Sequence, residues 1–513
     1  MTRRTVALKL GFSCWLIYTL HFATNMVREN YLALAIGDHF SFRLHEYANL
    51  HDDIFETPGY GWHIGSNPGA SLIGAIPYIL SRPVIDRVVE RMRRTRHENG
   101  RGAPPHYDAP TEKDRRFYEE AWRRGFDVKF GLASFVMQSF AMAVISALGV
   151  VVMYLLVVSV VEQPAAALAM ALLYAFGTPV FLRTGFLNHN LMLAHVGLLG
   201  FAILWNRWEW PSASPARRFF LAGVTGATAV LLDYSGLVIL AALWLYAIVK
   251  YSREHGKPGV LGLTFIYAAG ALGPVAVLWF YQWRSFGHPF RPPQHWMPPV
   301  EYSDQGYQGV AWPQWSLATS LAFDYRFGLF TTCPLFLLAV VAPFVNRRWR
   351  LLPRAELVMC LGVSAALFLF FSCVQYTRWQ FNTGIRYLSP AFPFLFLAVV
   401  SVLRKLPPLS VRSISVASVA IAWCMAMVRD VSGGKVELTD PDTGLGVLDP
   451  IRTVFTSGLQ LPAITTLSRM DAYRHLIDPN FATLLLFVLA AVLVLVVWKP
   501  KALNVGRLIS AFR

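Results

Sequence analysis

The chain has 513 residues, of which 55% are hydrophobic and only 15% are charged. Soluble domains average about 25% charged residues, and apolar stretches of roughly 16–25 residues, long enough to cross a bilayer, recur from end to end. Soluble, fibrous and disordered classes are therefore excluded, and we predict an all-α polytopic membrane protein. Basic loops between spans account for the net charge of +16, so we expect no nucleic-acid partner.

About twelve transmembrane helices are predicted from the apolar stretches. They cover residues 7–25, 131–160, 165–183, 191–206, 217–232, 235–250, 260–282, 328–345, 357–374, 387–403, 411–428 and 481–498. A further apolar segment, 69–85, is short and contains Pro77, Arg82 and Pro83. If this segment does not cross, every short loop on the side of the N-terminus is basic, which is the positive-inside pattern. We therefore expect 69–85 not to cross and both termini to be cytoplasmic.

This topology predicts three parts. A transmembrane module covers 1–428, with one large outer loop at 26–130 and a second at 283–327, and 429–480 is an outer segment. The last span and a basic cytoplasmic tail occupy 481–513. At the start of the first loop, Tyr31, Leu34 and Ile36 give an apolar side to a helix that we expect to lie in the membrane interface. The charged stretch 86–125 is expected to be helical at both ends.

The first outer loop concentrates carboxylates close to the predicted membrane surface. Its candidate acids are Glu29, Asp53, Asp52 and Glu46. A half-buried carboxylate in such a place can have a raised pKa and act as a general base. The structural alternative is that each acid caps a helix or pairs with a nearby arginine. For any single acid that alternative is favoured, whereas for the cluster as a whole a functional role is favoured.

Two turns on the same face carry further polar side chains. His189 lies between Asn188 and Asn190 where two apolar segments reverse direction, and helix capping by asparagine is an equal alternative to function. Asp233 lies between two apolar runs, and carboxylates at membrane depth are costly enough to indicate function. An N-cap for the following helix is its alternative.

A set of arginines also maps to the outer face. They are Arg284, Arg291, Arg326, Arg378 and Arg386. A guanidinium at that depth can bind a lipid phosphate bidentately, although extension of the side chain toward the headgroups is a common alternative. The sequence holds no P-loop, no dinucleotide-binding glycine motif and no HExxH. No metal-binding pair of aspartates is apparent and the phosphate site would be positively charged, so we expect no metal cofactor, without excluding a divalent cation.

In its overall arrangement the chain resembles the GT-C superfamily of membrane glycosyltransferases. A first span leads into a large outer loop with acids, and that loop closes with Ser66-Asn67-Pro68-Gly69, similar to the "KPPG" of bacterial members. Further segments resemble family motifs in the same order: Gly177-Thr178-Pro179 followed by Asn188-His189, Phe286-Gly287-His288-Pro289-Phe290, Arg326-Phe327-Gly328-Leu329-Phe330, and Gly384-Ile385-Arg386-Tyr387-Leu388. Related aminoarabinose transferases carry an Asp-Glu pair and a lysine where this chain has Arg28-Glu29 and Asn67.

The resemblance implies transfer of a sugar from a polyprenyl-phosphate donor to an envelope lipid, glycan or protein on the outer face of the bacterial cytoplasmic membrane. It implies inversion at the sugar, with a first-loop carboxylate as base. Glu29 is the best placed, followed by Asp53 and Asp52 and then Glu46, while His189, Asp233 and Asn67 would support the site. Arg378 and Arg386, with Arg326 or Arg291, would hold the donor phosphate.

Two other classes fit some of these features. A polysaccharide polymerase or ligase would use the histidines of the 283–327 loop, although the long acidic first loop is not typical of it. A transporter or flippase of lipid-linked saccharides should show paired repeats and charges at mid-membrane depth, neither of which the sequence displays. We expect an enzyme that works as a monomer among membrane lipids.

Overall fold

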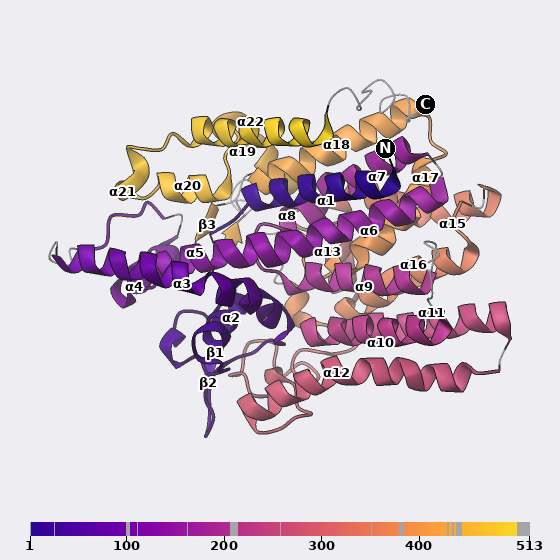
Figure 1. Cartoon of the computed structure of the whole chain (residues 1–513), viewed down its shortest axis with the longest axis horizontal. Helices are drawn as coiled ribbons and strands as arrows, with labels where there is room; N and C mark the ends of the chain where they lie inside the picture. The colour runs from indigo at the N-terminus through magenta and orange to yellow at the C-terminus, as the bar shows by residue number, and fades with distance from the viewer. Residues whose placement is uncertain are drawn as a thin grey trace.

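The computed structural model describes residues 2–24, 26–98, 103–109, 111–161, 163–205, 214–256, 258–349, 351–378, 384–427, 430–432, 435–437 and 444–499. Most of these residues are helical, and the long helices run side by side along the long axis of the molecule (Figure 1). The long helices are α1 (Arg3–Leu20), α5 (Asp127–Met137) continuing through a π-helical turn into α6 (Ala143–Val161), α7 (Pro164–Phe176), α9 (His189–Trp205), α10 (Pro215–Leu232), α11 (Gly236–His255), α12 (Val260–Phe286), α15 (Leu337–Trp349), α16 (Arg354–Ser372), α17 (Phe392–Leu403), α18 (Pro408–Met427) and α22 (Pro479–Trp498).

Six helices are long and apolar enough to cross a membrane by length and composition. They are Asp127–Val161, Gly236–His255, Val260–Phe286, Arg354–Ser372, Pro408–Met427 and Pro479–Trp498, and shorter apolar helices cover Pro164–Phe176, His189–Trp205 and Ser389–Leu403. Helices α1, α10 and α15 fall in neither set, so the number of about twelve spans stays a prediction. These features are those of an integral membrane protein.

Two predicted spans are not single helices. The segment 165–183 is divided into α7 and the short α8 (Pro179–Arg183), because Gly177 ends the first helix and the Thr178 hydroxyl caps the second. The segment 328–345 begins with α14 (Leu329–Thr332) and a 3-10 turn before α15. Both breaks precede a proline, which has no N–H to continue the preceding helix.

The long loops meet at one end of the bundle, which we call the loop end. There the backbone of Asp108 donates to Arg469 and that of Asp471 donates to His106, each at 3.0 Å, which joins the first loop to the 444–480 segment. The smaller elements of this end are α2 (Arg28–His39), β1 (Ile54–Thr57), β2 (Gly61–Ile64), α3 (Gly69–Glu98), α4 (Glu112–Arg124), α13 (Trp315–Phe323), β3 (Asp430–Ser432), β4 (Lys435–Glu437), α19 (Asp449–Ser457), α20 (Pro462–Ser468) and α21 (Asp471–Arg474).

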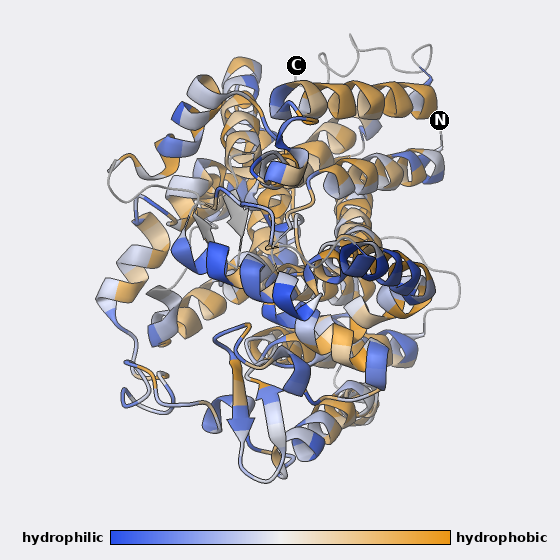
Figure 2. Ribbon diagram, turned by 90° about the vertical axis from the view of Figure 1, so that its left-hand side faces the viewer, coloured by the Kyte–Doolittle hydropathy of each residue, from blue (hydrophilic) through white to orange (hydrophobic). Residues whose placement is uncertain are grey.

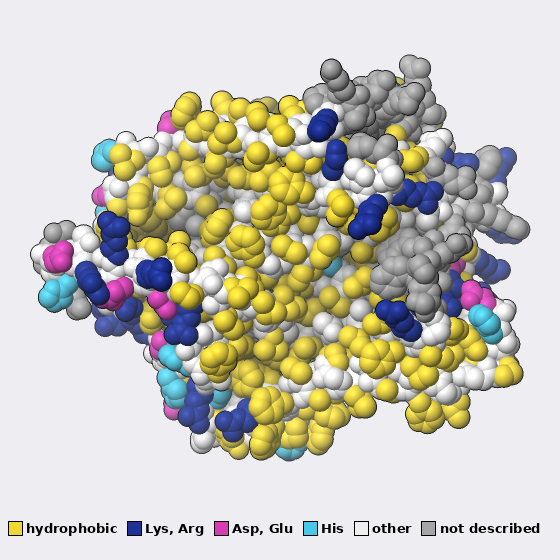
Figure 3. Space-filling model, viewed as in Figure 1, with side chains coloured by type: hydrophobic (Ala, Val, Ile, Leu, Met, Phe, Trp, Pro, Cys, Tyr) yellow, Lys and Arg dark blue, Asp and Glu magenta, His cyan; other side chains and the backbone are white. Residues whose placement is uncertain are grey.

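The opposite end holds the start of α1 and the end of α22. The indole of Trp498 donates to the Ser13 hydroxyl at 2.9 Å, so the end of α22 packs against the middle of α1. Between the two ends, hydrophobic side chains cover the visible surface, with charged side chains gathered at either end (Figure 3). On α22 the exposed side chains include Phe481, Leu485 and Val496. This surface matches the hydrocarbon core of a bilayer.

Helix α2 differs from its prediction as an interfacial helix. It forms over nearly the predicted residues, but Asn30, Tyr31, Leu32 and Ala33 are all buried, so protein surrounds it on every side. It packs against α3 and α5 rather than against lipid. Because its polar residues also find protein partners, a weakly amphipathic helix is placed inside the fold.

The segment 69–85 belongs to α3, which is a single helix through Pro77 and Pro83. Gly69 begins it against the backbone at the end of α10, where a Cβ atom would lie 2.7 Å from the Leu231 carbonyl oxygen. From there α3 projects out of the loop end together with α4 (Figures 1 and 2). The first part of α3 packs beside α2, α5 and the π-helical turn, and its position outside the membrane stays a prediction.

A β-hairpin in the first loop was not predicted. Strands β1 and β2 pair antiparallel, with Ile54 opposite Ile64 and Thr57 opposite Gly61. Gly61 has φ +90°, and a Cβ atom there would lie 2.6 Å from the His45 ring, so the hairpin requires glycine at this turn.

We predict that the loop end faces outside the cell. A cysteine placed at the exposed Arg116 of α4 should react with a membrane-impermeant maleimide on intact cells, and one placed at Arg253, near the end of α11, should react only after permeabilisation. The basic short loops motivate this orientation. Labelling with the reverse pattern would invert the topology.

Candidate functional site

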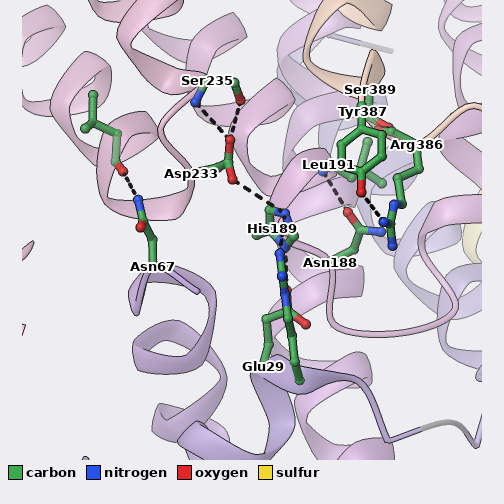
Figure 4. Close-up of polar contacts among 12 residues, drawn as sticks. Glu29, Asn67, Asn188, His189, Leu191, Asp233, Ser235, Arg386, Tyr387 and Ser389 are labelled. Carbon is green, nitrogen blue, oxygen red and sulfur yellow. Dashed lines mark hydrogen bonds and ion pairs between the residues drawn. The ribbon is translucent and has the colours of Figure 1, made fainter. Parts of the chain in front are cut away.

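Six ionisable side chains from five segments meet at the loop end, and we call them the central cluster. They are Arg28, Glu29, Asp53, His189, Asp233 and Arg386. Arg28 and Glu29 begin α2, Asp53 precedes β1, His189 begins α9, Asp233 ends α10, and Arg386 follows Gly384 before α17. Figure 4 shows the Asp233, His189 and Glu29 side chains in line with one another.

The contact between Glu29 and His189 joins the first loop to the helix bundle. His189 Nδ1 is hydrogen-bonded to Glu29 Oε1, and the Glu29 side chain is only 5% exposed. A buried carboxylate needs a partner to offset its desolvation. The imidazole supplies that partner and holds the carboxylate in one orientation.

Arg28 connects the two acids of the first loop. Its guanidinium lies 3.4 Å from Glu29 Oε1 and 3.3 Å from Asp53 Oδ2. It also lies 3.4 Å from His189 Nε2. Burial opposes the charge of Arg28, but Glu29 and Asp53 outweigh that effect and hold its pKa above the ordinary value. The arginine therefore stays charged between the two carboxylates.

Asp233 approaches the imidazole from the other side. Its Oδ2 lies 3.9 Å from His189 Nε2, while Oδ1 accepts hydrogen bonds from the backbone and the hydroxyl of Ser235 at 2.9 Å and 2.6 Å. The predicted N-cap alternative is thus partly met, since Asp233 organises the turn before α11. One oxygen serves the turn and the other faces the histidine.

Arg386 lies on the side of the cluster that Asp53 faces. It hydrogen-bonds to the Tyr387 hydroxyl, and its guanidinium is 4.4 Å from the centroid of that ring. Tyr387 in turn packs against Tyr376, with ring centroids 5.4 Å apart. The Tyr387 ring and hydroxyl thus hold the Arg386 guanidinium in place.

The environment sets the protonation of the two first-loop acids. Burial raises the pKa of Glu29, but the charge and hydrogen bond of His189 and the charge of Arg28 outweigh it and lower the pKa to about 2. For Asp53 burial also raises the pKa, and His51, Arg28 and Arg386 together lower it below the ordinary value. Both acids are therefore carboxylates at neutral pH.

Two predicted asparagines have structural contacts here. Asn67 donates from Nδ2 to the Val230 carbonyl at 2.8 Å, which fixes the segment between β2 and α3 on α10 (Figure 4). Asn188 accepts from the Leu191 backbone at 3.0 Å, which is the capping role that was the alternative to function. Both contacts fix chain segments next to residues of the central cluster, since Val230 is close to Asp233 in the chain and Asn188 precedes His189.

Other predicted site residues lie apart from the cluster in the described contacts. Asp52 is 78% exposed and pairs with Lys113 at 2.5 Å, and Glu46 pairs with His39 at 3.3 Å. Arg326 pairs with Asp324 at 3.1 Å, while Arg291 contacts His295 at 3.1 Å. The side chain of Arg378 lies outside the described residues.

One group of potential metal ligands occurs among the described residues. Asp38, His39 and Glu46 bring ligand atoms within 4.8 Å of one another. Asp38, however, already lies 2.6 Å from Lys129 Nζ and 3.3 Å from Arg82 Nε. These two cations occupy the carboxylate that a metal ion would need, so the group is better described as an ion-pair network.

Arg28 and Tyr387 belong to this region of the structure but were not among the predicted site residues. Arg28 directly precedes Glu29 and contacts three members of the cluster. Tyr387 follows Arg386 in the segment that resembled a family motif. In each case adjacency to a predicted residue was the available signal.

Comparisons with known proteins give one structural likeness. No protein-family model matches the chain, and no curated protein matches it. A solved structure that matches is the crystal structure of ArnT from Cupriavidus metallidurans bound to undecaprenyl phosphate, with 13% identity and a TM-score of 0.49 over 99% of this chain and 76% of that chain. ArnT is a GT-C glycosyltransferase, the class that the sequence resembles. At this identity and score, the likeness carries no argument about donor, acceptor or site residues.

The Glu29–His189 contact leads to a spectroscopic prediction. Replacing His189 with alanine removes the group that most lowers the Glu29 pKa, while burial of the carboxyl remains. The pKa should therefore rise, and a protonated carboxyl band should appear at mildly acidic pH in infrared difference spectra of His189→Ala but not of the wild type. Loss of the band in His189→Ala/Glu29→Gln, and its persistence in His189→Ala/Asp53→Asn, would assign it to Glu29. An unchanged spectrum in His189→Ala would contradict the assigned contact.

Proposed function

We propose that this protein is a membrane glycosyltransferase that moves a sugar from a polyprenyl-phosphate donor to an envelope acceptor. The observation that carries the proposal is the central cluster, in which a buried, ionised Glu29 is held by His189 and Arg28 beside the partly exposed Arg386. Such a cluster offers a proton acceptor and positive charge for a phosphate at one end of a membrane bundle. The sequence resemblance to the GT-C superfamily supports the same class.

The donor phosphate would meet the guanidinium of Arg386, with Arg28 behind it. Arg386 lies near enough to Asp53 to lower that residue's pKa. Charge-assisted hydrogen bonds from arginine to phosphate are strong and can be bidentate. The polyprenyl chain would leave the site through the apolar surface between the helices and enter the bilayer.

Glu29 would accept the proton from the acceptor hydroxyl. Its contacts with Arg28 and His189 both engage Oε1, and we assign the proton to Oε2. The bond between the sugar C1 and the phosphate oxygen breaks as the bond from C1 to the acceptor oxygen forms on the opposite face. The hydroxyl proton passes to Glu29. The phosphate oxygen keeps the electron pair of the broken bond, and the arginines stabilise its negative charge.

A carboxylate with a pKa of about 2 is a weak base. It suits a late proton transfer, since the hydroxyl becomes strongly acidic once its oxygen has begun to bond to C1. His189 would keep Glu29 oriented and stabilise its charge before the transfer. Asp53, which also pairs with Arg28, is the second candidate for the base.

The remaining parts of the proposal concern surroundings and partners. Two guanidinium groups supply the positive charge that a divalent cation would otherwise supply, so the transfer would require no metal. The loop end would face outward from the bacterial cytoplasmic membrane, where a monomer would meet an envelope lipid, glycan or protein. The position of the central cluster at one end of the bundle, instead of at mid-depth, favours transfer over transport.

Amide substitution distinguishes the two candidate bases. Glu29→Gln should lower kcat on a polyprenyl-phosphate sugar by about 10²–10⁴-fold, the range typical of a lost general base, with little change in donor affinity. Asp52→Asn should retain near-normal turnover, because Asp52 pairs with Lys113 outside the cluster. Loss of turnover in Asp53→Asn with normal turnover in Glu29→Gln would move the assignment to Asp53.

The phosphate contact has its own test in donor binding. Arg386→Ala should weaken binding of the lipid-linked donor by about ten- to a hundred-fold, the effect of one lost charge-assisted hydrogen bond. Arg326→Ala is the matched control, because Arg326 pairs with Asp324 apart from the cluster. Equal donor affinity in the two variants would exclude Arg386 from the phosphate site.

A further inference from the structure

The outward part of the first loop contains a pocket of 1090 Å³, separate from the central cluster. It lies between the far end of α3, the segment 103–107 and α4. Its charged lining is Arg93, Arg96, Arg115, Glu119, Arg123 and Arg124. Pockets of several hundred cubic ångströms are large enough to enclose a ligand rather than a single ion.

The lining holds five arginines and one glutamate, and four of the arginines are paired with carboxylates. The contact of Arg96 with Asp127 is bidentate, at 2.9 Å and 2.7 Å. Arg93 differs, because its described partner is a backbone oxygen, that of Gly125, at 3.3 Å, and its side chain is exposed. Gly125 has φ +72°, and a Cβ atom there would lie 3.1 Å from Arg93 Nε, so glycine both ends α4 and makes room for the arginine.

One wall of the pocket is aromatic. The rings of Tyr107 and Tyr118 are 5.4 Å apart, and those of Tyr118 and Trp122 are 6.3 Å apart. The Arg96 guanidinium lies 3.4 Å from the centroid of the Trp122 ring. Aromatic surface can pack against the C–H groups of sugar rings, and neighbouring arginines can bind their phosphate or carboxylate groups. This combination suits an anionic saccharide.

The pocket lies at the far end of α3 from the bundle. The start of α3 packs beside α5 and the π-helical turn, and its exposed apolar side chains reach as far as Val88, so Arg93 follows about 8 Å beyond the last of them at 1.5 Å per residue. Figures 1 and 2 show α3 pointing away from the bundle along its long axis. The headgroup layer of one leaflet is only about 6 Å thick. The pocket is therefore better placed for a glycan that extends from the membrane.

Helix α4 links the pocket to the loop that carries Asp53. Lys113 pairs with Asp52 at 2.5 Å, and Arg124 Nη1 donates to the carbonyls of Glu46 and Ala48 at 3.2 Å and 3.1 Å. Asp53, which directly follows Asp52, pairs with Arg28 of the central cluster. One helix thus forms a wall of the pocket and holds the loop that reaches the cluster.

We propose that this pocket binds an anionic saccharide segment of the acceptor, with its phosphate or carboxylate at Arg93 and its sugar rings along Tyr118 and Trp122. The identification of the ligand as the acceptor rests on the proposed glycosyltransferase function. The binding of an anionic saccharide at this place does not depend on that function, because it is inferred from the charge and shape of the pocket.

The test measures binding to the full-length protein in nanodiscs of neutral lipid by calorimetry. The anionic probes are tetragalacturonic acid and maltotetraose 6-phosphate, and maltotetraose is the neutral match. We expect an anionic probe to bind more tightly than maltotetraose, and Arg93→Gln to weaken that binding by about tenfold or more. Arg94→Gln is the control on the same helix, because Arg94 is 72% exposed, pairs with Glu90 and does not line the pocket. Arg93→Lys should recover part of the affinity.

Three outcomes would overturn the pocket assignment: equal binding of neutral and anionic probes, equal loss in Arg93→Gln and Arg94→Gln, or competition by phosphatidylglycerol in the nanodiscs that abolishes probe binding. Turnover of a lipid-linked donor is measured in parallel. Normal turnover with no Arg93-dependent binding refutes the pocket and leaves the proposed function standing. Arg93-dependent binding with no transfer from any polyprenyl donor refutes the proposed function and its identification of the ligand as an acceptor.

Discussion

The contact between Glu29 and His189 is the constraint on which the arrangement of the loop end depends. It joins residues 160 positions apart in the chain, from α2 and α9. An ionised carboxylate that is 5% exposed is tolerated only with its partners in place, and removing one partner of such a buried pair costs about 3–5 kcal/mol. The first loop therefore has to dock with α2 inside the fold, where Arg28 and His189 surround the carboxylate.

Much of this arrangement could be predicted from the sequence because it follows from membrane crossing. Apolar length predicts the helices, and the basic short loops predict which turns share a face. His189, Asp233 and Arg386 were assigned to the same face as Glu29 on this basis, and the structure brings all four together. A bilayer leaves few ways to connect such spans, so the chain order of the turns already restricts which side chains can meet.

Side-chain partners inside the loop could not be predicted in the same way. Asp52 and Asp53 are adjacent, yet one pairs with Lys113 at the surface and the other with Arg28 in the cluster. The β1–β2 hairpin that follows sets which of the two faces inward, and its register depends on tertiary contacts such as that of Gly61 with His45. Helix α2 shows the same limit, because its modest amphipathic pattern fits an interface and its polar partners are distant in sequence.

The proposed transfer releases a proton from the acceptor hydroxyl and leaves negative charge on the departing phosphate. Arg28 interacts electrostatically with the groups at both places. It touches Glu29, the proposed proton acceptor, and Asp53, whose pKa also reflects Arg386 near the proposed phosphate site. When Glu29 takes up the proton it loses its negative charge, and Arg28 is then less neutralised by its neighbours. The same guanidinium thereby presents more positive charge to the phosphate as the phosphate leaves. A shared arginine can thus couple bond breaking to proton transfer without any movement of the backbone, which is an advantage in a cluster where Glu29 is buried and its partners are half-buried.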